Sequence, residues 1–276
     1  MASVVVAAHN EGVVIASCIG ALQDYPGNLD IVVVPNGCSD DTAEMARAAG
    51  ARVIETEVAG KSAALNLGDA ATQEFPRLYL DADISITGTQ LAQLISALES
   101  DPATVVVAPA RRIVTTGRPV FVRAYYAINQ LHPAFKSGLF GRGVCVMSEA
   151  GRSRFIEFPD IIADDLFLDS LFTLEERKIV DEVVVSVAAP MATGDLLRRL
   201  VRVRKGNSQL REASADSTLM RAPDRTAWLR EVVIPNPSLM PAAIVYVLIS
   251  VLAAIGARLS KRPNWGQDRS TRKRSR

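Results

Sequence analysis

The stretch RLYLDADISI, residues 77–86, places two aspartates directly after a run of apolar residues. The run RLYLD predicts a buried strand, and Asp81 and Asp83 then stand where the strand ends and a loop begins. Side chains at positions i and i+2 of a strand are about 6.6 Å apart, so a turn starting at Ala82 is needed to bring both carboxylates to one point. A divalent cation and a solvated turn are the two interpretations that this stretch allows.

Four other β-branched runs have the same character. They are apolar at consecutive positions, which is typical of strands buried on both faces. Segments with helical spacing separate them, and the second of these opens with Asp41 and Glu44 in capping-box spacing. The alternation predicts an α/β fold with a mostly parallel, doubly wound sheet. The expected strands, besides 77–81, are 3–8, 30–35, 51–55 and 104–108, and the expected helices are 13–23, 42–50, 61–71 and 89–100.

Polar residues follow the expected strands at their carboxyl ends, where ligands bind in open parallel sheets. Asn10 and Glu11 follow the first strand, Asn36 follows the second, and Lys61 opens the helix after the third. Each feature alone is explained by a turn or a helix cap. Lys61 is the exception, because a cation at a helix start is disfavoured by the helix dipole. The convergence of these residues with the two aspartates on one edge predicts a ligand site.

Four segments, taken in order and spacing, resemble the nucleotide-binding half of family 2 glycosyltransferases. The resemblance covers residues 3–110 and continues more loosely through GRGVCVMS (141–148) and ADDLFL (163–168). It implies a GT-A-like fold and transfer of a sugar, with inversion, from a nucleotide diphosphate donor. The four segments are AAHNEG (7–12), NGCSDDT (36–42), GKSAALNLG (60–68) and LDAD (80–83).

The resemblance also implies roles for individual residues. Asp83 matches the ligand of Mg²⁺ or Mn²⁺, and hard oxygen ligands suit both ions. Asp165, with Asp164 beside it, matches the position of the general base; helix-start acids favoured by the dipole are the alternative. The donor-nucleotide contacts would be Asn10, Glu11, Asn36, Lys61 and Asp81. The family usually has an acidic residue where Pro35–Asn36 stand, so the choice between a UDP- and a GDP-linked donor stays open.

The segment DLLRRLVRVRKGN, residues 195–207, carries five Lys/Arg but lacks the QxxRW motif of processive family members. The resemblance therefore implies transfer of a single sugar rather than polymer synthesis. The basic side chains either face a diphosphate or lipid phosphate, or they are a solvated helix face. The acceptor is expected to be a hydroxyl group, with lipid-linked acceptors included.

The C-terminal part contains an uncharged run, residues 241–257, followed by a basic segment. Residues 258–276 hold eight Lys/Arg and one acid, a net charge of +7. We expect a catalytic domain at 1–230, an apolar helix that anchors the protein in a membrane at 231–259, and a basic tail at 260–276. About 20 apolar residues span a bilayer. A full span would place the tail outside, against the positive-inside rule. A span, an interfacial helix and a buried helix all stay open.

Composition narrows the remaining function classes. Three cysteines without CxxC spacing argue against a disulfide framework or a thiol zinc site, and the Met1 region has no signal-peptide pattern. We expect the cytoplasmic face of the cell membrane and no nucleic-acid partner. A sugar-phosphate nucleotidyltransferase is one alternative, although AAHNEG lacks the glycine-rich basic loop such enzymes carry. A non-catalytic membrane-associated scaffold is the other, although it predicts loss of carboxylates that this chain retains.

Overall fold

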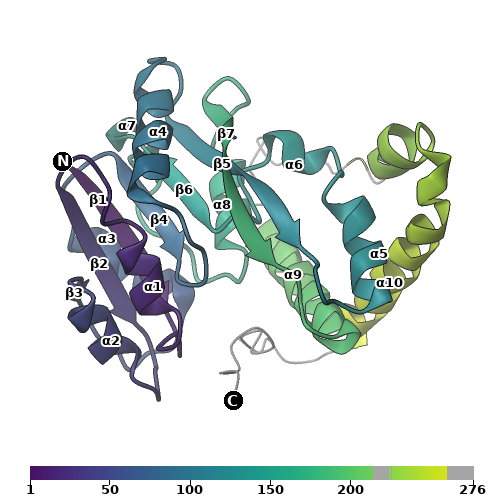
Figure 1. The fold of residues 1–276 in the computed structure, drawn as a ribbon, viewed down its shortest axis with the longest axis horizontal. Helices are drawn as coiled ribbons and strands as arrows, with labels where there is room; N and C mark the ends of the chain where they lie inside the picture. Colours follow the sequence, from purple (N-terminus) through teal and green to yellow (C-terminus); the bar gives the residue numbers. More distant parts are fainter. Residues whose placement is uncertain (214–223, 225, 260–276) are drawn as a thin grey trace. The chain divides into compact units, whose positions relative to one another are not determined.

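The computed structural model describes residues 1–213, 224 and 226–259, which form two compact units (Figure 1). The first unit comprises Met1–Arg111, Leu139–Asp160 and Leu171–Ser186. The second comprises Arg112–Gly138, Ile161–Ser170 and the chain from Val187 onward. The predicted boundary at residue 230 stays a prediction, and the predicted tail, 260–276, lies outside the described residues.

A seven-stranded sheet has the strand order β3-β2-β1-β4-β6-β5-β7. β1 pairs in parallel with β2 and β4, and β2 pairs in parallel with β3. The predicted α/β fold with a mostly parallel sheet is therefore confirmed. The strands are β1 (Ala2–Ala8), β2 (Leu29–Pro35), β3 (Arg52–Val53), β4 (Arg77–Asp81), β5 (Val106–Val114), β6 (Val144–Met147) and β7 (Arg177–Ala188).

The central strands are buried on both faces, as their unbroken apolar runs predict. Val4, Val5 and Val6 of β1 are all fully buried although alternate side chains of a strand point to opposite faces. β4 begins and ends at the predicted residues, so Asp81 is its last residue.

One strand of the sheet differs from expectation. The sequence predicts a strand at 104–108 in the mostly parallel sheet, and β5 begins there, at Val106. The additional strand β6 lies between β4 and β5 and is antiparallel to both. Its sequence, VCVM, has only four residues and follows a short loop with two glycines, so the sequence predicts no separate strand here. The insertion brings that loop to the end of β4.

The helices of the first unit lie where helical spacing predicts them, with shorter ends. The capping box predicted at Asp41 and Glu44 is wrong, since Asp41 makes no side-chain cap. Asp40 instead accepts a hydrogen bond from the Thr42 backbone N–H, and a capping box forms at the start of α4. The helices are α1 (Ile15–Gly20), α2 (Thr42–Ala48), α3 (Lys61–Ala70), α4 (Gly88–Glu99) and α7 (Glu149–Arg152).

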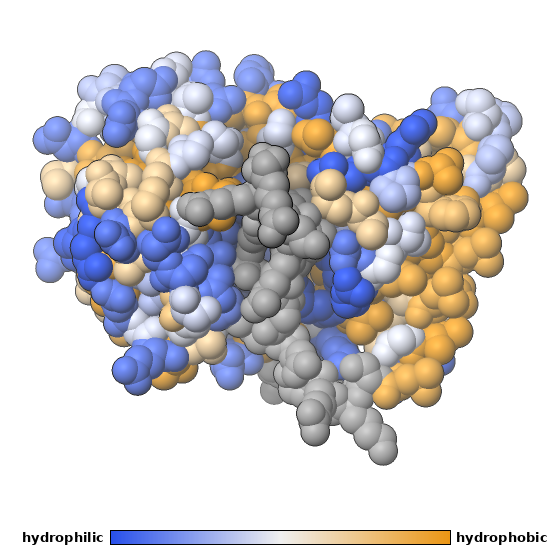
Figure 2. Space-filling model, turned by 60° about the horizontal axis from the view of Figure 1, so that its bottom comes forward, coloured by the Kyte–Doolittle hydropathy of each residue, from blue (hydrophilic) through white to orange (hydrophobic). Residues whose placement is uncertain are grey.

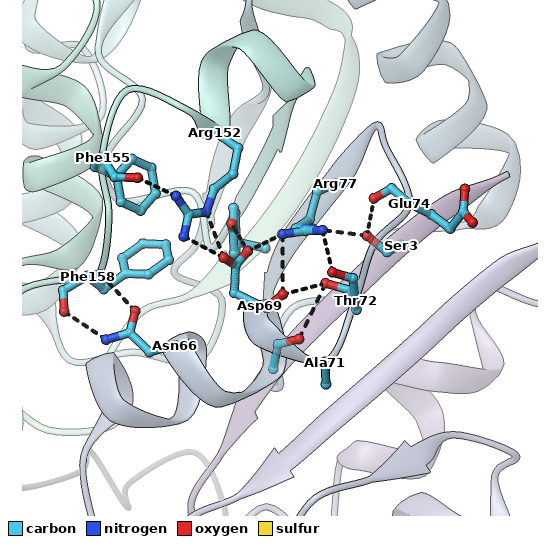
Figure 3. A network of polar contacts seen from close by, with 12 residues as sticks. Ser3, Asn66, Asp69, Ala71, Thr72, Glu74, Arg77, Arg152, Phe155 and Phe158 are labelled. Carbon is cyan, nitrogen blue, oxygen red and sulfur yellow. Dashed lines mark hydrogen bonds and ion pairs between the residues drawn. The ribbon is translucent and has the colours of Figure 1, made fainter.

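A buried polar network fixes the end of α3 within the first unit (Figure 3). Asp69 accepts hydrogen bonds from Arg77, Tyr79 and Arg152. Asn66, one turn earlier, exchanges two hydrogen bonds with the backbone of Phe158. Burial alone raises the pKa of Asp69, but the hydrogen bonds from Arg152, Tyr79 and Arg77 outweigh it and hold that pKa below its ordinary value. The network therefore ties α3 to β4 and to the segment after β6.

The second unit is mostly helical. α10 packs against α5 and α9, and the Tyr125 and Tyr246 rings stack with centroids 5.0 Å apart. The predicted C-terminal apolar helix is thus confirmed as a helix. The elements are α5 (Val120–Asn129), α6 (Ala134–Ser137), α8 (Asp164–Ser170), α9 (Thr193–Ala213), a π-helical turn η1 (Leu229–Val233), a 3₁₀ turn η2 (Pro237–Leu239) and α10 (Met240–Leu259).

Candidate active site

The polar strand ends of the first unit meet at one edge of the sheet. The parallel register places Ala8 beside Pro35, and Ala7 beside Asp81. The residues that directly follow β1, β2 and β4 are therefore neighbours in space. This edge, formed by residues 9–12, 36–42, 60–61 and 81–83, is called the donor edge below.

β4 ends in a tight turn that presents Asp83. The Ile84 backbone N–H donates to the Asp81 carbonyl at 3.0 Å, which closes a β-turn over Ala82 and Asp83. Ala82 and Ile84 are buried, whereas Asp83 is exposed and Asp81 is half-buried. The turn predicted at Ala82 is present, and it carries both carboxylates to the surface of the donor edge.

Gly143 lies directly against Asp81. The Asp81 backbone N–H donates to the Gly143 carbonyl at 2.8 Å. Gly143 has a φ of +67°, and a Cβ atom there would lie 2.9 Å from Asp81 Oδ2 and 2.6 Å from a side-chain carbon of Ile84. Only glycine satisfies both constraints without displacing the turn. The glycine loop before β6 therefore supports the carboxylate of Asp81.

Lys61 and Asp81 form an ion pair at the donor edge. Lys61 Nζ lies 2.7 Å from Asp81 Oδ1, and the two side chains are 29% and 37% exposed. Lys61 is the first residue of α3, where the helix dipole disfavours a cation. Asp81 supplies the compensating charge, so two predicted donor contacts are brought together here.

The loop after β1 is held by the turn after β2. Asn10 adopts a left-handed backbone with φ 55°, and its side-chain oxygen accepts from the Ser39 N–H at 2.8 Å. The Glu11 N–H donates to Thr42 Oγ1 at 2.7 Å, and the Gly12 N–H donates to Asp40 Oδ2 at 3.1 Å. These contacts fix Asn10 and Glu11 at the edge.

Asp40 and Thr42 were not singled out as site residues from the sequence. Burial alone raises the pKa of Asp40, but hydrogen bonds from Thr42 and Gly12 hold it below its ordinary value. The carboxylate is therefore ionised when it accepts these bonds. The sequence signal for both residues is the serine–aspartate turn at 39–42. Its role, which is to hold the loop after β1, is visible only once β1 and β2 are adjacent.

The buried residue Asn36, which follows β2, is hydrogen-bonded both to the end of β1 and to the start of α3. Asn36 is only 1% exposed. Its side-chain nitrogen donates to the Ala8 carbonyl at 2.8 Å, and its side-chain oxygen accepts from the Gly60 N–H at 3.2 Å. Its own carbonyl oxygen lies 2.6 Å from His9 Nδ1. A contact between the Asn36 side chain and a nucleotide stays a prediction, and this burial favours a role in holding the loops that make such contacts.

Three carboxylates share one region of negative potential at the donor edge. Burial, and after it charge repulsion from Asp83, Asp81 and Glu11, together raise the pKa of the Cys18 thiol to about 12. All three acids thus lie near the same point of α1. Asp81 and Asp83 offer hard oxygen ligands at the surface, a set that fits Mg²⁺ or Mn²⁺ when donor phosphates complete the coordination. Among residues 1–213, 224 and 226–259, no group of three or more His, Cys, Asp or Glu side chains forms a closed metal cage.

The family model for glycosyl transferase family 2 matches residues 3–148, more than half of the chain. The chain belongs to glycosyl transferase family 2. It is a glycosyltransferase, and the matched region contains the whole donor edge and ends after β6. Among curated proteins, none matches the sequence.

Solved glycosyltransferase structures share the fold. A mannosyltransferase from Pyrobaculum calidifontis, in complex with GDP-Man and Mn²⁺, aligns with a TM-score of 0.63 at 21% identity, over 94% of this chain and 79% of that one. Glucosyl-3-phosphoglycerate synthase from Mycobacterium tuberculosis, in complex with Mg²⁺ and UDP, aligns with a TM-score of 0.56 at 21% identity, over 82% and 81%. The predicted GT-A-like fold is confirmed.

The remaining predicted residues of this glycosyltransferase, Asp164 and Asp165, belong to the second unit. Both lie in the first turn of α8, and Asp165 Oδ1 accepts a hydrogen bond from the Leu166 N–H at 2.8 Å. Gly206 of α9 packs closely on Ala163, just before the pair. The position of both acids in the first turn of α8 is also the position that a helix-start acid occupies. The assignment of Asp165 as general base stays a prediction.

Proposed function

We propose that this glycosyltransferase moves a single sugar, with inversion, from a UDP- or GDP-linked donor to a hydroxyl acceptor. The proposed place of action is the cytoplasmic face of the cell membrane, where a lipid-linked acceptor fits. The observation that carries the proposal is the donor edge, where Asp81, Asp83 and Lys61 converge in a chain of family 2. The neighbouring structures with GDP-Man and Mn²⁺, and with UDP and Mg²⁺, support both donor bases and both ions.

Donor binding uses the residues already brought together. Asp83, with Asp81 beside it, would hold Mg²⁺ or Mn²⁺, which supplies neutralisation of the charge that grows on the departing diphosphate. Lys61 offers a second positive charge within reach of the same phosphates. Asn10 and Glu11 border the nucleotide, with Asn36 keeping their loop in place. In the absence of donor, Lys61 compensates the charge of Asp81.

The transfer step is a single displacement. The acceptor oxygen attacks the anomeric carbon while the bond from that carbon to the diphosphate oxygen breaks, which inverts the configuration. Asp165 is proposed to take the proton from the acceptor hydroxyl as the new bond forms. Asp164 is the alternative base, because only one carboxylate of an adjacent pair needs to face the acceptor.

Family membership favours glycosyl transfer over the nucleotidyltransferase alternative. A non-catalytic scaffold on the same fold predicts loss of the functional carboxylates, whereas Asp81, Asp83 and Asp165 are all present. Neither alternative gains support from a described feature.

The first experiment is a screen of nucleotide-sugar hydrolysis by purified full-length protein. UDP- and GDP-linked sugars are tested with Mn²⁺, with Mg²⁺ and with EDTA. We expect turnover of one donor class that requires a divalent cation. Absence of turnover with all donors in the presence of either ion contradicts the proposal, and equal turnover in EDTA contradicts the metal role of Asp83.

The second experiment separates the base from the donor site. Once a donor and acceptor are known, Asp165→Asn should lower turnover by about 10²- to 10⁴-fold, the usual range for a general base, while donor affinity stays near wild type. Asp164→Asn is the matched control and should lose less. If Asp164→Asn abolishes turnover and Asp165→Asn does not, the roles are reversed. If both variants keep normal turnover, the pair is a helix cap.

A further inference from the structure

α10 presents a continuous apolar face to the surface of the second unit. Large side chains spaced three or four residues apart lie on one side of the helix. Figure 2 shows the apolar surface, in orange, gathered over the part of the chain labelled α10 in Figure 1. Six members of this face, each at least 41% exposed, are Ile244, Val247, Leu248, Val251, Leu252 and Ile255.

The opposite face of α10 is packed against other helices along its length. Near its start Ala243 is buried in a cluster with Ile128 and Val233, and Tyr246 stacks on Tyr125 of α5. Near its end Gly256 packs against the Val201 side chain of α9. The small residues Ala243 and Gly256 let the helices approach closely. One face of the apolar helix α10 therefore packs against other helices, and the other face is exposed.

The segment Pro237–Leu259 is long and apolar enough to cross a membrane, and 17% of its most apolar stretch is buried among the described residues. A buried terminal helix would be covered on all sides, so that interpretation fits poorly. If α10 crossed the membrane, the helix α9 that packs against it would also enter the hydrocarbon region. α9 holds six Lys/Arg, including Arg199 and Arg204, and charged side chains are costly at the centre of a bilayer.

The geometry points to an interfacial arrangement: we propose that α10 lies along the surface of an anionic membrane, with its exposed apolar face in the headgroup–acyl boundary, and does not cross the bilayer. This proposal rests on the membrane location given under the proposed function. α10 has 20 residues, so it lays about 30 Å of apolar surface on the membrane. The chain after α10 then stays on the side of the catalytic domain, as the positive-inside rule requires.

Charge favours an anionic lipid surface over other occupants. The described residues of the second unit contain twelve Lys/Arg and seven Asp/Glu, a net charge of +5. The sequence that follows α10 is also basic, so electrostatic attraction and apolar burial act together. That basic sequence is too polar to cover the apolar face itself, and a second copy of the chain would meet like charge.

The test is flotation of full-length protein with vesicles of phosphatidylcholine, with or without phosphatidylglycerol. Wild-type protein should bind the anionic vesicles more tightly, and salt raised from about 0.1 M to about 1 M should weaken the binding. Burying one leucine side chain is worth about tenfold or more in affinity, so Leu248→Glu combined with Leu252→Glu should lower vesicle affinity by about 100-fold. Ile156→Glu is the matched control, because Ile156 is 91% exposed on the first unit, and it should change affinity less than about twofold.

Leu248→Gln with Leu252→Gln removes the apolar contacts without adding charge and should weaken binding to an intermediate degree. Unchanged far-ultraviolet circular dichroism confirms that both double variants fold. Equal vesicle binding by wild type and both double variants overturns the proposal. Loss of a wild-type dimer in the variants, with no vesicle binding by wild type, overturns it in favour of a second copy.

Topology separates an interfacial helix from a span. In sealed membrane vesicles, tags placed before Met1 and after Arg276 should be accessible to protease from the same face. A tag after Arg276 that is protected while the first tag is cleaved means that α10 crosses, which overturns the proposal. Hydrolysis of a soluble donor by the Leu248→Glu, Leu252→Glu variant should equal wild type, so failure of the membrane contact and failure of the donor site are read separately.

Discussion

The two ends of α3 carry ion pairs that differ in burial. At its start Lys61 meets Asp81, with side chains 29% and 37% exposed. Near its end Asp69 meets Arg77, with side chains 8% and 4% exposed, and Arg152 adds a second guanidinium (Figure 3). One helix therefore has a charge pair sealed in the core and another open to solvent at the donor edge.

The difference separates stability from function. A charge in the buried network cannot lose its partner without standing uncompensated in a low-dielectric core. A half-exposed pair is weak because water and salt screen it, so its partners can exchange for a ligand. The buried end holds α3 in place, and the exposed end offers Lys61 and Asp81 to the donor. The predictions below test this division.

Asp69→Asn should give the largest effect. Breaking a buried ion pair by changing one partner usually lowers the free energy of unfolding by about 3–5 kcal/mol. Asp30→Asn is the control, because Asp30 pairs with Arg52 on the surface, and it should stay within about 1 kcal/mol of wild type. Urea denaturation of both variants measures the difference, and equal small losses would remove the contrast between the two ends.

Donor nucleotide should stabilise the fold only by binding at the exposed start of α3, at the donor edge. At 100 times its dissociation constant a ligand raises the free energy of unfolding by about 2.7 kcal/mol. UDP or GDP should produce this rise with Mg²⁺ or Mn²⁺ and not with EDTA, and Asp83→Asn should weaken the metal-dependent part. Thermal shift with a nucleotide series measures it. The same shift in EDTA would show that Asp83 holds no metal.

Lys61→Met should leave the ligand-free protein almost unchanged. Loss of a half-exposed pair alters the free energy of unfolding by less than about 1 kcal/mol. Donor-nucleotide affinity should fall by about tenfold, because a charge-assisted contact is lost. Lys61→Arg keeps the charge and should restore part of that affinity. A large loss of stability without any loss of affinity would make Lys61 a structural residue like Asp69.

The smallest effect is a dependence of stability on pH. The pKa of Asp69 is lowered in the folded state, so its contribution is fully present above the unfolded-state pKa of about 3.9. The contribution is lost as pH falls through the folded-state pKa. Wild-type protein should therefore lose stability below about pH 4 more steeply than Asp69→Asn does. Parallel curves for the two proteins would show that Asp69 is not the group responsible.

The sequence could predict the elements whose signal is local. β4 was bounded correctly because its apolar run ends at Asp81, and the turn at Ala82 followed from the spacing of the two aspartates. β6 was missed as a strand because VCVM is too short to show a period, and its place between β4 and β5 depends on distant pairing. The capping box at Asp41 failed because Asp40 takes the Thr42 N–H instead.

Long-range contacts set the limit for the site as well. Asp69 and Arg152 are 83 residues apart, so nothing in the sequence marks them as partners. Lys61 was recognised as poorly explained at a helix start, but Asp81 could be named as its partner only after β4 and α3 were placed. The sequence predicts that the Asn36 side chain contacts a nucleotide. The structure shows that this side chain is buried and that its amide group is hydrogen-bonded to backbone groups.

The close packing of Gly143 against Asp81 has a consequence for the interpretation of sequence variants of this protein. Any side chain at that position meets the carboxylate of Asp81 and the chain of Ile84, in a backbone conformation that favours glycine. A substitution there would damage the donor edge while leaving every aspartate of the motif intact. A scan of genomes that asks only whether the aspartates are kept would score such an allele as active. Diagnosis of loss-of-function alleles in this chain therefore needs the glycine before β6 as well as the acids after β4.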